Sequence, residues 1–147
     1  MTGLRSDDLV GTWRLVSWRA DHADGSSRQP FGERPQGYVV YTADGHMITT
    51  ISVAGRPRIG GDLFSAPPQA QADAFATFMA YSGRFRVEGE VVVHTVELSM
   101  YPDWVGTEQR RHVRLDDDRL GLNLSTDPVP AGGTTMRHRL DWERVTD

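Results

Sequence analysis

Apolar and polar residues alternate along the chain in eight runs, each bounded by glycine, proline or acidic turn residues. Alternation with a period of two is typical of β-strands that bury one face. The runs cover residues 12–20, 37–42, 46–53, 81–87, 90–99, 107–115, 120–125 and 134–144. No repeat or linker separates them, so residues 1–147 are expected to form one all-β domain.

A single helix is predicted between the third and fourth runs. The stretch "SAPPQAQADAFATFMA" begins with two prolines and continues with strong helix formers. Phe75, Phe78 and Met79 have helical spacing and would form one apolar stripe. Two roles are open for this stripe: it packs the helix onto the domain, or it forms a lid.

The connections between the runs are of two kinds. The tight turns "TADG", "EG" and "DDDR" alternate with long connections. In an up-and-down meander, alternate connections lie at opposite ends of the sheet. The sequence therefore predicts an eight-stranded antiparallel barrel with a closed floor and a mouth formed by loops, large enough inside for one small ligand.

Run 90–99, "EVVVHTVELS", carries a polar residue on each face. If Glu88–Gly89 is a two-residue turn, Gly83 faces His94 and the inner face holds His94, Val96 and Leu98. A three-residue turn would invert the strand and place Glu97 inside. Both registers remain open at this point.

Two further polar residues are predicted to point inward. In run 107–115, Arg111 shares a face with Val113 and is opposite to the charged face that includes Arg110. In run 134–144, His138 shares a face with Leu140. Arg111 would pair with an internal carboxylate, sit in water, or hold an anionic or enolic ligand oxygen.

Other cavity residues are expected on the inward faces and at the rim. Candidate ligand-binding residues are Tyr41, Met47, Thr49, Tyr81, Phe85, Val96, Trp104 and Gln109, with Glu97 added in the inverted register. Trp18, Tyr101 and Phe64 are also expected near the mouth, where they would stack on a flat guest or cover the opening.

Composition excludes several classes of chemistry. The chain has no cysteine and no lysine, which excludes disulfides, thiol nucleophiles and Schiff bases. The net charge is −4 without a basic stripe, so nucleic acid is not an expected partner. No apolar run could span a bilayer and no leader is visible, so a cytoplasmic protein is expected. No metal or cofactor motif is found.

Several stretches resemble known barrels. "GTW" (11–13), together with an arginine near "LDWER", is similar to the lipocalin pattern, in which an arginine packs across the tryptophan of the floor; Arg144 or Arg139 would take that place. "LVGTWRLVSW", "PFGERPQGYVVYTADGHM" and "VVHTVELSMYPDWVGTEQRRHVRLDDDRL" resemble the bacterial lipocalin-like domain family. This resemblance implies a calycin-type barrel with a ligand cavity. Such barrels are often dimeric, so a homodimer is one expectation.

Two functions fit these observations. In the first, the barrel binds a polyketide-, polyene- or terpenoid-like molecule and acts as a cofactor-independent cyclase or isomerase of natural-product biosynthesis. His94 or His138 would move a proton, and Arg111 would stabilise negative charge on oxygen. In the second, the barrel carries or senses a small apolar ligand with an acidic or enolic group. Inner polar groups that are all bonded to one another favour the second, and unpaired groups that converge on empty space favour the first.

Overall fold

The computed structural model describes residues 3–146, and hydrogen bonds between its first and last long strands close a barrel. The barrel strands are β1 (Gly11–His22), β3 (Gln36–Tyr41), β4 (His46–Ser52), β5 (Phe78–Glu88), β6 (Val91–Ser99), β7 (Glu108–Leu115), β8 (Gly121–Ser125) and β10 (Thr135–Arg144). Each strand pairs antiparallel with the next, and β10 pairs with β1. The predicted eight-stranded antiparallel barrel is confirmed.

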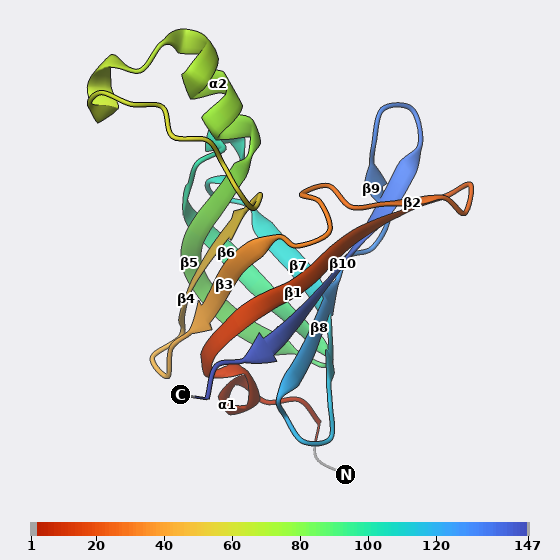
Figure 1. Cartoon of the computed structure of the whole chain (residues 1–147). Helices are drawn as coiled ribbons and strands as arrows, with labels where there is room; N and C mark the ends of the chain where they lie inside the picture. The colour runs from red at the N-terminus through yellow and green to blue at the C-terminus, as the bar shows by residue number, and fades with distance from the viewer. Residues whose placement is uncertain (1–2, 147) are drawn as a thin grey trace.

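The remaining elements are short. They are the helices α1 (Ser6–Leu9) and α2 (Pro68–Ala76), the helical turns η1 (Leu63–Ser65) and η2 (Pro102–Trp104), and the strands β2 (Ser27–Arg28) and β9 (Val129–Pro130). Figure 1 shows α1 and the tight hairpin turns at one end of the barrel, and α2, β2 and β9 at the other. The expected separation into a floor and a mouth is therefore present.

The floor is built around Trp13, which is completely buried. Its indole nitrogen donates to the carbonyl of Leu9 at the end of α1, over 2.9 Å. The guanidinium of Arg144 lies 4.1 Å from the centre of the Trp13 ring and donates to the carbonyls of Val10 and Asp8. Arg144 thus takes the place expected for the floor arginine, whereas Arg139 forms an exposed ion pair with Asp21.

The prediction that Phe75, Phe78 and Met79 form one apolar stripe on the helix is wrong. Helix α2 ends at Ala76, and Phe78 and Met79 are the first residues of β5, where they pair with β4. Phe75 stays on the helix but is 51% exposed. Phe78 and Met79 join the sheet because pairing with β4 satisfies their backbone N–H and C=O groups. In this position the Met79 side chain points into the barrel and lines the cavity.

The β5–β6 hairpin differs from the expected register by two residues. Glu88 pairs with Val91, so the turn is Gly89–Glu90 and His94 lies opposite Phe85, not opposite Gly83. Gly89 has φ +60°, a conformation that suits a glycine in a tight turn. Because a shift of two residues preserves the face of each side chain, His94 still points inward.

A β-bulge at Glu97 corrects two further expectations. The register shifts between Ser82 and Gly83, which pair with Leu98 and Val96, so Glu97 is the extra residue. Leu98 consequently turns outward and is 70% exposed, although alternation placed it inside. The Glu97 side chain is also exposed and lies 3.8 Å from Arg84, so it does not line the cavity.

Candidate functional site

The upper half of the barrel encloses a cavity of about 450 Å³. Its wall is mostly apolar, and its polar side chains are two histidines, one arginine, one glutamine, two threonines and one tyrosine. The lining residues are Trp18, Val39, Thr49, Ile51, Met79, Tyr81, His94, Trp104, Gln109, Arg111, Leu124, Thr126, Val129, Pro130, His138, Leu140 and Trp142. This combination of an apolar wall and few polar groups is typical of small-molecule sites, which run from roughly 300 to 1,000 Å³.

His94 lies at the base of this cavity between two tyrosines. Its Nε2 is 2.7 Å from the hydroxyl of Tyr41, and its Nδ1 is 2.7 Å from the hydroxyl of Tyr81. The histidine is only 2% exposed. Burial, helped by the positive charge of Arg111, lowers the pKa of His94 to about 3, so the imidazole is neutral near neutral pH. The same burial raises the pKa values of both tyrosines.

His138 reaches the cavity from β10 and is also engaged. Its Nδ1 accepts a hydrogen bond of 3.0 Å from the indole nitrogen of Trp18. Burial lowers the pKa of His138, and the charges of Arg111 and Arg28 add to this effect. Trp18 packs on Phe31 with 4.8 Å between ring centres, which fixes the indole at the mouth.

Arg111 carries the positive charge of the cavity. Its guanidinium donates to the carbonyl of Arg110 over 2.9 Å and reaches Gln109 Oε1 over 3.4 Å. Within residues 3–146, no carboxylate forms an ion pair with it. Its charge influences the pKa values of the histidines and tyrosines around the cavity, so a ligand anion there would be the first negative partner of this group.

The sequence-predicted site residues divide into three groups. Those that line the cavity are Thr49, Tyr81, His94, Trp104, Gln109, Arg111 and His138. Those that are buried but lie outside the lining are Tyr41, Met47, Phe85 and Val96. Glu97 is on the outside of the barrel and is removed from the set.

Some lining residues were not predicted. Leu124, Thr126, Val129 and Pro130 come from the end of β8 and from β9. Alternation with Leu122 could have indicated Leu124, whereas the stretch after β8 consists mostly of turn residues and shows no alternation. Among the expected rim aromatics, Trp18 and Trp104 line the cavity, Tyr101 packs edge-on against Trp104, and Phe64 is 91% exposed.

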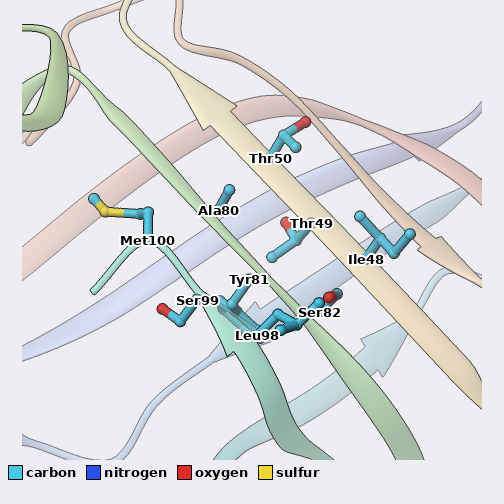
Figure 2. A pocket seen from close by; sticks show the side chains of 9 residues that line it. All are labelled: Ile48, Thr49, Thr50, Ala80, Tyr81, Ser82, Leu98, Ser99 and Met100. Atoms are coloured by element: carbon cyan, nitrogen blue, oxygen red, sulfur yellow. The ribbon is translucent and has the colours of Figure 1, made fainter. Parts of the chain in front are cut away.

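A second hollow lies on the outer surface of β4, β5 and β6 (Figure 2). It is lined by Ile48, Thr49, Thr50, Ala80, Tyr81, Ser82, Leu98, Ser99 and Met100. Tyr81 is the one titratable residue in this lining, whereas the interior cavity gathers His94, His138 and Arg111. The interior cavity is therefore the candidate site.

The described residues give no support for a metal site or a membrane anchor of the helical type. No group of three or more histidine, aspartate or glutamate side chains within residues 3–146 is arranged to hold a metal ion. None of the helices in this part of the chain is both long enough and apolar enough to cross a bilayer.

A family model described as a lipocalin-like domain matches residues 10–145, nearly the whole barrel. The chain belongs to the lipocalin-like domain family. It is also similar to a protein of Aspergillus oryzae (strain ATCC 42149 / RIB 40) that is named 4'-hydroxy-3'-methoxypropiophenone carrier protein ppsC. The two are 34% identical over 108 residues, which cover 67% of this chain and 96% of the relative. The lipocalin-like barrel and this relative both support small-molecule binding.

Proposed function

We propose that this lipocalin-like barrel is a carrier that binds a small aromatic or otherwise apolar molecule with an acidic or enolic oxygen, and releases it unchanged. The observation that carries this proposal is that both cavity histidines, the candidate acids and bases, already hold hydrogen-bond partners. His94 is bonded at both ring nitrogens, and His138 is bonded to Trp18. Engaged groups of this kind favour a binding site over an acid–base catalyst.

The hypothesis of a cyclase or isomerase has less support. A general acid or base works best when its pKa lies near the working pH. Burial moves the pKa of His94 to about 3, far from that range. The carrier hypothesis needs no proton transfer and uses the same cavity.

The chemistry of the relative's named ligand matches the cavity. 4'-Hydroxy-3'-methoxypropiophenone combines one aromatic ring with a ketone and a phenol. The ring would contact Trp18, Trp104 and Trp142, and a carbonyl or phenolate oxygen would accept hydrogen bonds from Arg111. An acyl group para to a phenol makes the phenol more acidic, which suits a guanidinium that has no carboxylate partner within residues 3–146.

Fluorescence titration tests this proposal, because three tryptophans line the cavity. Saturable quenching by 4'-hydroxy-3'-methoxypropiophenone with a Kd in the micromolar range, and recovery of the compound unchanged after incubation, is the expected result. Quenching that does not saturate, or conversion of the compound, would contradict the carrier.

A pair of arginine variants tests the role of Arg111. Arg111→Gln removes the charge from the cavity and is expected to weaken binding of the ionised phenol about tenfold, the value of one charge-assisted hydrogen bond. Arg110→Gln is the matched control, because Arg110 lies on the outer face and pairs with Glu88 at 2.9 Å. Equal affinity of both variants would assign Arg111 a structural role.

A further inference from the structure

The hydrogen bonds around the two cavity histidines determine which atoms point hydrogens into the cavity. A neutral imidazole carries one N–H, so one ring nitrogen donates and the other accepts. His94 contacts a tyrosine hydroxyl through each nitrogen. The direction of the hydrogen bonds in Tyr41–His94–Tyr81 therefore has two alternatives.

In the first alternative, the Tyr41 hydroxyl donates to Nε2 of His94, and Nδ1–H donates to the oxygen of Tyr81. The hydroxyl hydrogen of Tyr81 then remains free. In the second alternative the directions are reversed, and the hydroxyl hydrogen of Tyr41 remains free. The two alternatives differ in which tyrosine must find another acceptor.

The surroundings of the two tyrosines favour the first alternative. Tyr41 is completely buried outside the cavity lining, with the Phe85 ring packed against it at 4.8 Å. Its hydroxyl has no other hydrogen-bond partner than His94 within residues 3–146. A free hydroxyl there would lose its hydration without compensation. Tyr81 lines the cavity, where a ligand or water can accept its hydrogen.

The tautomer of His138 is fixed by Trp18. An indole nitrogen can only donate, so Nδ1 of His138 must accept and carries no hydrogen. The single hydrogen of this imidazole therefore sits on Nε2, for which no hydrogen-bond partner is present within residues 3–146. His138 thus adds a second donor to the wall of the cavity.

The other polar groups of the wall add donors or are already engaged. A guanidinium such as that of Arg111 has only donors, and the indole nitrogen of Trp142 is a buried donor with no partner among the described residues. Among the acceptors, Gln109 Oε1 already faces Arg111. The Thr49 hydroxyl donates to a backbone carbonyl, and Thr126 Oγ1 accepts a backbone N–H.

We infer that the cavity presents hydrogen-bond donors to its guest, from Tyr81, His138 and Arg111, and so selects ligands whose buried oxygen is an acceptor only. A ketone, a carboxylate or a phenolate satisfies these donors. The corresponding alcohol brings a hydrogen of its own, which finds few free acceptors. This inference rests on the proposed binding function and specifies the class of ligand.

Nitrogen-15 NMR of histidine-labelled protein near neutral pH tests the tautomers without a ligand. The expected result is an Nδ1–H tautomer for His94 and an Nε2–H tautomer for His138. An Nε2–H tautomer for His94 would overturn the inference, because Tyr81 would then direct its hydrogen at the imidazole. This result would leave the carrier proposal standing.

A matched pair of ligands tests the selectivity. Propiophenone and 1-phenylpropan-1-ol share one carbon skeleton and differ only in the carbonyl or hydroxyl group. The ketone is expected to bind about tenfold more tightly. Tyr81→Phe is expected to reduce this preference, whereas Tyr38→Phe, at a half-exposed tyrosine on the outer face, should preserve it. If the wild-type protein binds the two compounds equally, the inference is overturned and the carrier proposal stands. If it binds neither compound, both the inference and the carrier proposal are overturned.

Discussion

Lowering the pH is expected to destabilise the folded barrel, because His94 is buried in its neutral form. In the unfolded chain this imidazole takes up a proton near its ordinary pKa of 6.5, whereas in the folded protein it does so only near 3. Between these values the unfolded state binds more protons than the folded state. The contribution of neutral His94 to the free energy of unfolding is therefore fully present above about pH 6.5 and decreases as the pH falls. Each pH unit in this window costs about 1.4 kcal/mol, which gives a loss of about 2 kcal/mol at about pH 5.

Urea unfolding at about pH 7 and about pH 5 measures this loss, and a variant isolates the contribution of His94. His94→Gln keeps a side chain that can hydrogen-bond to both tyrosines but does not titrate. The decrease in its free energy of unfolding between about pH 7 and about pH 5 should therefore be about 2 kcal/mol smaller than the decrease in the wild type. Equal losses in the wild type and His94→Gln, or an NMR titration of His94 with a midpoint near 6, would refute the reasoning.

Three further substitutions probe the floor, the bulge and the rim through the free energy of unfolding. Arg144→Met should cost about 3 kcal/mol, because it removes the contact with the floor tryptophan and several hydrogen bonds, whereas Arg139→Met, in an exposed ion pair, should cost less than about 1 kcal/mol. Gly83→Ala should cost about 2 kcal/mol or more, since its Cβ would lie 1.9 Å from a carbonyl oxygen of β6, and Ser82→Ala should be nearly neutral. Phe64→Ser, at a 91% exposed side chain, should change stability by less than about 0.5 kcal/mol and leave ligand affinity unaltered.

The strands could be predicted from the sequence because alternation and turn residues are local properties. The failures occur where pairing between strands overrides the local pattern. Phe78 and Met79 have helical spacing, but β4 takes them into its ladder. Leu98 alternates correctly with Val96, but the bulge at Glu97 reverses its direction. A bulge depends on the partner strand, which the pattern of one strand does not contain.

The candidate site was predictable in part for the same reason. The inward direction of His94, Arg111 and His138 follows from alternation, and all three line the cavity. Their hydrogen-bond partners do not follow from alternation, because they are distant in the sequence. Tyr41 is separated from His94 by 53 positions, and Trp18 is separated from His138 by 120 positions. The chemical state of each histidine depends on those partners, so the argument for the proposed carrier could not be made from the sequence alone.

The closed floor of the barrel limits how a ligand can enter and leave the cavity. Leu9 and Trp13 are fully buried at the end covered by α1, and Arg144 ties that end to the backbone. For the proposed carrier, a guest that enters beside Trp18 would have to leave by the same route. Loading and release would then use one opening, and the segments around that opening would set the rate of ligand exchange. A molecule that receives the ligand would have to approach the end of the barrel that carries β2 and β9, because the floor and the sides are closed.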